Sequence, residues 1–272
     1  MTRMIVIICA AALLANAAGA AAPAANGSST GPIHPGVQTF TGSAQCTANF
    51  IFRDAGGTYI GQAAHCASTG AATGTDGCIT GSRPLNTPVT VTGATRPGTL
   101  VYSSWLAMKA RNETDVNACR FNDFALVRLH PDDVVRVDPS VPGFGGPNGV
   151  GRADTGATVY SYGNSSLRFG ITQLRPKQGV VLQVLGNGSN RLVYTVTPGI
   201  PGDSGGGFLN AQGQAIGVLS TVALAPLPLS NGVGDLAKEL DYARANGFPG
   251  LKLVNGTRPF TGDLLGAILE GA

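Results

Sequence analysis

The stretch Gly202-Asp203-Ser204-Gly205-Gly206 says more about the fold of this chain than any other segment. It places one serine hydroxyl among glycines, which allow the backbone to turn tightly at little steric cost. Such a turn can also direct backbone N–H groups at a bound substrate. A glycine-rich hairpin loop without any chemistry has the same composition, so the interpretation depends on the rest of the chain.

Two earlier segments support the chemical interpretation, namely Gln62-Ala63-Ala64-His65-Cys66 and Asn122-Asp123-Phe124-Ala125-Leu126. Each is modest evidence alone, because a lone histidine is often a satisfied core residue and Asn-Asp is an ordinary turn pair. Together with residues 202–206, in the order His, Asp, Ser, they resemble the signature segments of the chymotrypsin-like (trypsin-like) serine protease family, in its secreted bacterial form. The resemblance covers roughly residues 37 to 222.

This resemblance implies an all-β fold of two six-stranded antiparallel β-barrels, with the active site in the cleft between them and short C-terminal helices. The composition agrees with a β architecture, because the 272-residue chain has 40 glycines and only 12% charged residues. Turn-type residues also divide the sequence into many short apolar runs, which is typical of all-β proteins.

The resemblance assigns a role to each signature residue. Ser204 would be the nucleophile, His65 the base that removes its proton, and Asp123 the group that fixes the imidazole tautomer. An imidazole suits the task because its pKa lies near neutrality. The backbone N–H groups of Gly202 and Ser204 would form the oxyanion hole.

The family also implies how the specificity pocket is built. Pro198, six residues before Ser204, would form its floor, while Ser220, Thr221 and Val222 would form a wall that hydrogen-bonds the substrate backbone. A proline floor offers no charge for a basic substrate residue, and residues 217–222 contain no histidine of the kind that glutamate-specific relatives use. We therefore expect small or medium apolar residues before the cleaved bond.

Asp203 in this family is buried and paired with a cation that keeps the loop in its active shape. The Ile-Val-Gly-Gly mature terminus that supplies this cation in activated zymogens is missing here. An internal arginine is a candidate replacement, and the sequence leaves the partner of Asp203 open.

Residues 202–206 also fit Gly-x-Ser-x-Gly, the nucleophile elbow of α/β-hydrolases. That fold needs a histidine after the serine, whereas His34, His65 and His130 all precede Ser204. Chain order therefore excludes an elbow triad.

The N-terminus predicts export. Met-Thr-Arg is followed by an apolar run from Met4 to Ala15 and then by small residues, the pattern of a signal peptide, and the run is too short to span a bilayer comfortably. Ala18-Gly19-Ala20 fits a cleavage site, with Ala22 as the alternative. We expect a secreted, extracellular protein with no stable membrane association after signal removal.

The domain plan combines the composition with the two barrels that the resemblance implies. It comprises a signal peptide (residues 1–20), a flexible lead-in (21–36), an N-terminal β-barrel carrying the His and Asp (37–138), a Pro- and Gly-rich linker (139–151) and a C-terminal β-barrel carrying the Ser, with C-terminal helices (152–272). Helical spacing in the last part predicts helices over 233–246 and 261–269. A strand is expected over 99–106, among others.

Cysteine usage agrees with export. Cys9 would leave with the signal peptide, so Cys46, Cys66, Cys78 and Cys119 remain. An even count in an exported protein suggests two disulfides, although four cysteines allow three pairings. The family's histidine-loop disulfide implies Cys46 with Cys66, which leaves Cys78 with Cys119.

Other partners are not indicated. No Cys-x-x-Cys pair or zinc-type histidine spacing occurs, so we expect no metal and no cofactor. The net charge of +3, without a basic run, gives no support for nucleic acid as a partner. The expected protein is a monomeric serine endopeptidase acting on polypeptides, and the alternatives are an inactive secreted binding protein of the same fold and an esterase-like hydrolase.

Overall fold

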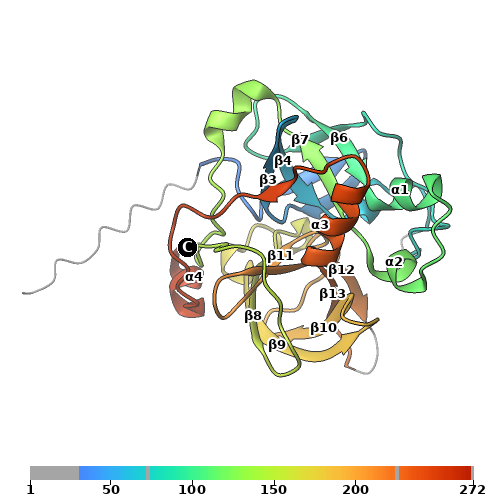
Figure 1. The fold of residues 1–272 in the computed structure, drawn as a ribbon. Helices are drawn as coiled ribbons and strands as arrows, with labels where there is room; N and C mark the ends of the chain where they lie inside the picture. The colour runs from blue at the N-terminus through green and yellow to red at the C-terminus, as the bar shows by residue number, and fades with distance from the viewer. Residues whose placement is uncertain (1–30, 72–73, 224–226, 271–272) are drawn as a thin grey trace, which may run out of the picture.

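The computed structural model describes residues 31–71, 74–223 and 227–270. The predicted signal peptide and most of the predicted lead-in therefore lie outside the described residues. Two β units pack on each other, one built mainly from the first half of the chain and one from the second (Figure 1). Within the described residues, no helix is long and apolar enough to cross a membrane.

The N-terminal unit is an eight-stranded antiparallel sheet in the order β14-β3-β4-β7-β6-β5-β1-β2. The expectation for this half was a closed six-stranded barrel, and the hydrogen bonding gives a sheet with two edges instead. Its strands are β1 (Gln38–Thr41), β2 (Ala44–Thr47), β3 (Ile51–Asp54), β4 (Gly57–Gln62), β5 (Pro88–Val91), β6 (Gly98–Ser103), β7 (Ala125–Arg128) and β14 (Lys252–Leu253).

The C-terminal unit is a closed six-stranded barrel in the order β10-β13-β12-β11-β8-β9, as the sequence predicts for this half. Its strands are β8 (Thr158–Tyr162), β9 (Pro176–Leu185), β10 (Asn190–Thr195), β11 (Gly207–Asn210), β12 (Ala215–Ala223) and β13 (Ser230–Asp235). Closure pairs β9 with both β8 and β10, so this barrel leaves no strand edge exposed.

Alternation of apolar and polar residues explains where the strands form. In β5, Val89 and Val91 are buried while their neighbours Pro88 and Thr90 are exposed, which is the period-2 pattern of a half-buried strand. Strands at the centre of the sheet, such as β7, are apolar on both faces and buried on both. Burial of these side chains is the main favourable contribution to folding.

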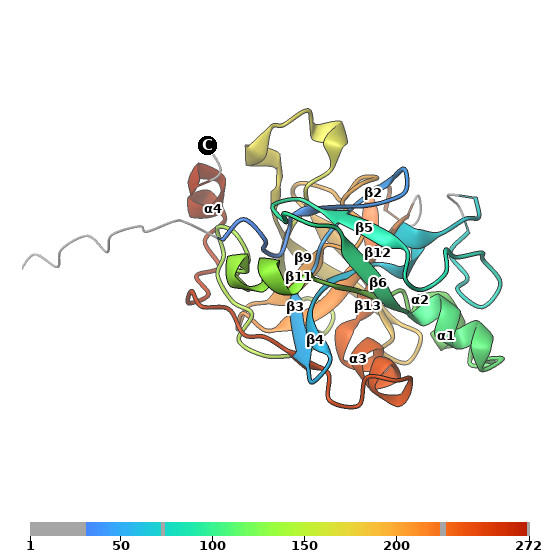
Figure 2. The ribbon, with the colours of Figure 1, turned by 90° about the horizontal axis from the view of Figure 1, so that it is seen from above.

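Short helices connect and cover the two units. They are the α-helices α1 (Ser104–Ala110), α2 (Val116–Phe121), α3 (Leu236–Ala245) and α4 (Leu264–Glu270) and the 3-10 helices η1 (Ala64–Ala67), η2 (Pro131–Arg136), η3 (Ser166–Arg168) and η4 (Thr172–Leu174). Helix α3 packs on β12 and β13 of the barrel and also contacts α1. Seen from above, α4 lies on the opposite side of the molecule from α1 and α2 (Figure 2).

Two helix predictions need correction at their starts. Residues 233–235 end strand β13 rather than begin a helix, because Val233 and Gly234 pair with β10 and β12. Helix α3 begins after Asp235, whose side chain accepts the Lys238 N–H as a helix cap. Similarly, α4 begins at Leu264, and residues 104–106 of the strand predicted over 99–106 belong to α1.

Three segments that the composition assigned to a lead-in, a linker or the second half of the chain also pack into the fold. Ile33, within the predicted lead-in, is fully buried and forms a β-bridge with Val137. Val141 and Phe144 of the predicted linker are buried core residues. Near the C-terminus, β14 adds a strand to the N-terminal sheet by pairing with β3.

Candidate active site

Strand pairing brings His65 and Asp123 together. Strands β4 and β7 are neighbours, and their register places Gln62 opposite Ala125. His65 follows β4 on η1, and Asp123 lies just before β7. The Ala64 N–H also donates to the Asp123 carbonyl at 3.2 Å, which fixes the two segments side by side.

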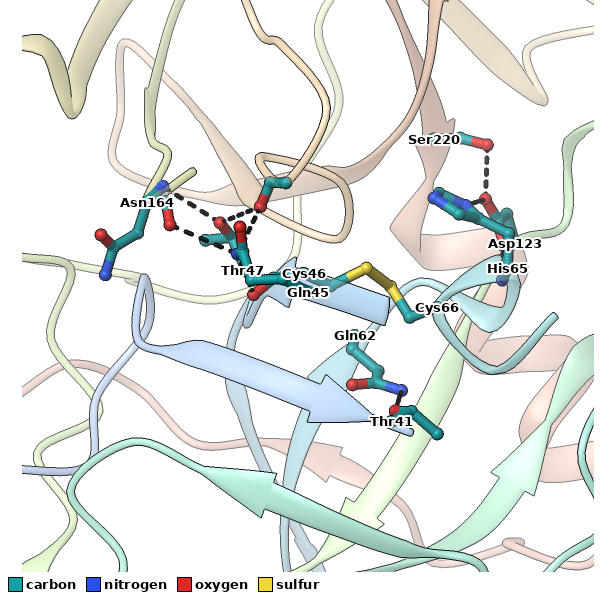
Figure 3. The surroundings of a disulfide bond; sticks show 11 residues. Thr41, Gln45, Cys46, Thr47, Gln62, His65, Cys66, Asp123, Asn164 and Ser220 are labelled. Atoms are coloured by element: carbon teal, nitrogen blue, oxygen red, sulfur yellow. Dashed lines mark hydrogen bonds and ion pairs between the residues drawn. A yellow bond between two sulfur atoms is a disulfide. The ribbon is translucent and has the colours of Figure 1, made fainter. Parts of the chain in front are cut away.

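The Asp123 carboxylate is buried and fully hydrogen-bonded. Its Oδ2 lies 2.6 Å from Nδ1 of His65 and its Oδ1 accepts the His65 backbone N–H at 2.8 Å. The hydroxyl of Ser220, on β12, donates to Oδ2 at 2.5 Å (Figure 3). The imidazole is therefore oriented through Nδ1, which directs Nε2 away from Asp123.

The pair changes the acidity of both groups. Burial lowers the pKa of His65, but the charge of Asp123 and the hydrogen bond to it raise it by more, so the pKa lies above the ordinary histidine value. Burial alone raises the pKa of the Asp123 carboxyl, whereas the charge of His65 and the bonds from His65 and Ser220 bring it below its usual range. Asp123 therefore stays ionised while His65 titrates.

Ser204 lies in the loop before β11, between two glycines with left-handed backbone. Gly202 has φ +95° and Gly205 has φ +88°, a region in which side chains are strained. A Cβ on Gly205 would lie 2.8 Å from the Ala63 nitrogen, so the loop lies directly against the segment that leads to His65. The Thr47 N–H donates to the Ser204 carbonyl at 2.8 Å and fixes the loop from the N-terminal unit.

Asp203 is fully buried and bonded to two cations. Its Oδ2 lies 2.7 Å from Nη2 of Arg168 and 3.0 Å from Nζ of Lys177. Arg168 is an internal arginine, the residue type suggested as a replacement for the N-terminal cation of activated zymogens. Lys177 is a second cation, which the sequence did not indicate. Burial lowers the pKa of Lys177 to about 8, with the charge of Asp203 opposing this effect and that of Arg168 adding to it.

The expected pocket residues lie near this cluster and near Asp123. The carbonyl of Pro198 accepts from Nη2 of Arg168 at 2.7 Å and from Nζ of Lys177 at 3.3 Å. Both cations therefore fix the residue that is expected to form the pocket floor. Ser220, Thr221 and Val222 are consecutive on β12, and Val222 is 37% exposed.

Two cavities in the described part of the chain are lined by residues other than the expected site residues. One of about 350 Å³ lies where residues 32–38, the linker and α4 meet. The other, of about 140 Å³, lies behind Asp123 and is lined in part by Asn122 and Glu239.

Both disulfides have the pairing that the resemblance implied. Cys46 on β2 bonds Cys66 on η1, next to His65, and Cys78 bonds Cys119 on α2 (Figure 3 shows the first). The clusters of potential metal ligands in the described part of the chain both depend on these cysteines. Sulfurs in a disulfide are not thiolates, so these clusters offer no metal site.

Three interactions near the site were not predicted from the sequence. These are the Ser220 hydroxyl on Asp123, Lys177 on Asp203, and a carboxyl of Glu239 that accepts the Asp123 backbone N–H at 3.3 Å. Ser220 was expected only as a pocket wall. Each contact joins residues about 26 to 116 positions apart, and no local pattern in one sequence signals such a pairing.

Comparisons with known proteins identify the family and the fold. A family model described as the trypsin-like peptidase domain matches residues 46–218. Among solved structures, Thermobifida fusca Protease A is 21% identical with a TM-score of 0.52, covering 82% of this chain and 99% of that one. The Cellulomonas bogoriensis chymotrypsin structure is 19% identical with a TM-score of 0.48, covering 82% and 98%. A search of curated proteins found no match.

Proposed function

The chain belongs to the trypsin-like peptidase family, and on this basis we propose that it is a secreted serine endopeptidase that hydrolyses peptide bonds through an acyl-enzyme. His65, Asp123 and Ser204 would form its catalytic triad. The observation that carries the proposal is the Asp123 carboxylate, which holds both the Nδ1 and the backbone N–H of His65. This arrangement leaves Nε2 as the free ring nitrogen.

The proposed reaction uses these groups in sequence. The Ser204 Oγ attacks the substrate carbonyl carbon while Nε2 of His65 takes the hydroxyl proton. The protonated imidazole then gives this proton to the leaving amine, which breaks the peptide bond and leaves an acyl-enzyme. A water molecule, deprotonated in turn by His65, releases the acid product and restores Ser204. Asp123 stabilises the imidazolium in both halves of the reaction.

The proposed oxyanion hole is supported by two unused donors. Among the described residues, the backbone N–H groups of Gly202 and Ser204 have no protein acceptor. Buried or half-buried backbone N–H groups are normally paired, so two free ones beside a nucleophile are suited to an anionic ligand. Gly202 has a left-handed backbone in this loop, a conformation that glycine adopts without strain.

Export is supported by the two disulfides, which persist in oxidising compartments and are rare in the cytosol. We therefore keep the proposal of a secreted, extracellular protein. That it is a monomer acting on polypeptides without a cofactor is a separate part of the proposal.

For specificity, we propose small or medium apolar residues before the cleaved bond. The Pro198 carbonyl is occupied by Arg168 and Lys177, so the proposed floor offers no free acceptor for a basic residue. The branched side chain of Val222 would narrow the entrance. Sequencing the cleavage products of a peptide library would test this, and strong selection for Arg, Lys or Glu would contradict it.

The alternatives make different predictions. An inactive binding protein would not react with a reagent that phosphonylates active-site serines. An esterase-like hydrolase would react with it and would cleave small acyl esters but not peptides.

The decisive experiment combines this reagent with variants. We expect stoichiometric labelling of the wild type at Ser204, and Ser204→Ala or His65→Ala should each lower peptidase activity by roughly 10⁴-fold to 10⁶-fold. The double variant should be little worse, because triad members act as a unit. Ser82→Ala, in the loop before β5, is the control and should remain active. An active Ser204→Ala protein would falsify the assignment.

A further inference from the structure

Glu239 is a buried carboxyl group directly behind Asp123. It lies on α3 and is 2% exposed, and its Oε1 accepts the backbone N–H of Asp123 at 3.3 Å. The proposed triad uses only the side chain of Asp123, so this contact acts on the backbone of a residue whose position matters for the chemistry. Glu239 itself takes no part in the proposed reaction.

Among the described residues, no cation pairs with this carboxyl. Lys238, the neighbouring cation on α3, directs its Nζ to the Asn187 carbonyl at 2.6 Å and to Ser189 at 3.0 Å. Arg191, the other nearby cation, is bonded to Asp235 at 2.7 Å. The charges that act on Glu239 are those of Asp123 and Asp235, and both are negative.

The second oxygen of Glu239 also lacks a partner. Its Oε2 is buried and has no hydrogen-bond partner in the described part of the chain, and the same is true of Oδ1 of Asn122. Both residues line the 140 Å³ cavity behind Asp123. An oxygen of each is thus buried without a donor at one small cavity.

Protonation of Glu239 would remove the unpaired buried charge and would give Oε2 a hydrogen to donate. A carboxylate buried without a cation is far more costly than a neutral acid, and a neutral acid has one O–H donor. Burial raises the pKa of Glu239 well above its usual range, and the charges of Asp123 and Asp235 add to this effect while the Asp123 N–H opposes it. A protonated Oε2 then carries an O–H donor, and the unpaired Oδ1 of Asn122, a residue that lines the same cavity, is an acceptor without a donor.

We propose that Glu239 is a positioning residue that acts as a protonated carboxylic acid, holding the Asp123 backbone N–H with Oε1 and donating from Oε2 toward the Asn122 side chain. This inference rests on the proposed function, because Asp123 matters only if it orients His65. A neutral acid provides a rigid acceptor for the backbone without adding a second negative charge behind the Asp123 carboxylate.

Two substitutions separate this role from simple packing. Glu239→Gln keeps an acceptor for the Asp123 N–H and a donor for the cavity, so kcat at neutral pH should stay within about twofold of the wild type. Glu239→Leu keeps much of the volume but leaves the backbone N–H unpaired, and kcat should fall roughly tenfold with KM unchanged. Glu270→Gln, on α4 at the opposite side from α1, is the matched control and should not differ from the wild type.

Infrared spectroscopy provides a readout that needs neither catalysis nor the Leu variant. The wild type and Glu270→Gln should show the carbonyl stretch of one protonated carboxylic acid at neutral pH, and Glu239→Gln should lack it. Absence of this band from the wild type would overturn the proposal, as would a Leu variant with the kcat of the wild type. If no variant or wild type cleaves peptides, the band still decides the state of Glu239, so the two proposals fail separately.

Discussion

Two aspartates of the candidate active site are buried, and they are stabilised in different ways. Asp123 receives its hydrogen bonds from a titratable imidazole, a backbone N–H and a hydroxyl. Asp203 is bonded to two side chains that carry positive charge, Arg168 and Lys177. One carboxylate therefore has one neighbour, His65, whose charge can change near neutral pH, and the other is held by the permanent cation of Arg168 with Lys177 beside it.

The difference distinguishes an aspartate proposed to act in the reaction from one that stabilises the conformation of the Ser204 loop. In the proposed reaction His65 gains and loses a proton, so it needs a partner that tolerates both states, as Asp123 would. The proposed oxyanion hole needs a loop of fixed shape, and the ion pairs of Asp203, next to Ser204, would hold that shape. Substitutions at the two sites should therefore affect different quantities.

The largest expected effect is on catalysis at Asp123. Asp123→Asn would place an amide donor against Nδ1, so that His65 would adopt the tautomer with a proton on Nε2 and could not accept the serine proton. We expect kcat to fall by roughly 10⁴-fold, with little change in thermal stability. Steady-state kinetics and thermal unfolding of the same preparation would check this, and a large loss of stability would place Asp123 with Asp203.

Asp203→Asn should act mainly on stability. It leaves Arg168 and Lys177 buried without a counter-charge, and breaking a buried ion pair in this way costs about 3 to 5 kcal/mol. Denaturant unfolding would measure the change. Asp154→Asn, at an exposed position, serves as control and should alter the free energy of unfolding by less than about 0.5 kcal/mol. If Asp203→Asn and Asp154→Asn changed the free energy of unfolding equally, the ion-pair cluster at Asp203 would not be needed for the fold.

The acid side of the activity profile tests the Asp123 site alone. His65 must be neutral to accept a proton, and its pKa lies above the ordinary value of about 6.5 because of Asp123. Activity should therefore fall about tenfold per pH unit once the pH is below that raised pKa, while the fold, held by Asp203, persists. A kcat/KM profile that is flat from pH 5 to 8 would exclude His65 as the base.

The smallest effect is expected within the cluster itself. Lys177→Met removes the cation with the lowered pKa and leaves Arg168 on Asp203, so the free energy of unfolding at pH 7 should change by no more than about 1 kcal/mol. Since the folded pKa of Lys177 is below the unfolded one, wild-type stability should rise with pH from about 8 to about 10.5, and the variant should lack this rise. Arg168→Met, which also removes one of the two donors to the Pro198 carbonyl, should lower the free energy of unfolding by more than Lys177→Met does. Unfolding curves across this pH range would rank the two.

The sequence predicted the features that are encoded in local patterns. The three signature segments indicated the fold family, and the cysteine pairing followed from the resemblance and agrees with the structure. Short apolar runs marked most strands, because period-2 burial is visible along the chain.

The features that the sequence did not reveal depend on distant contacts. Val233 and Gly234 continue the helical spacing of residues 236–245, yet pairing with β10 and β12 makes them strand. The N-terminal sheet has eight strands partly because β14 joins it from the other end of the chain. Lys177 and Glu239 look like ordinary surface charges in the sequence, and only the packing shows that both are buried.

Strand β14 has a consequence for the order of assembly. It covers the outer edge of β3, in the sheet that carries His65 and Asp123, yet it is made nearly 200 residues after β3. While the chain is synthesised from its N-terminus, that sheet keeps an unprotected edge until residues 252–253 have been made. The sheet that holds His65 and Asp123 therefore gains its last strand only after all six strands of the barrel, so this sheet is completed late in synthesis.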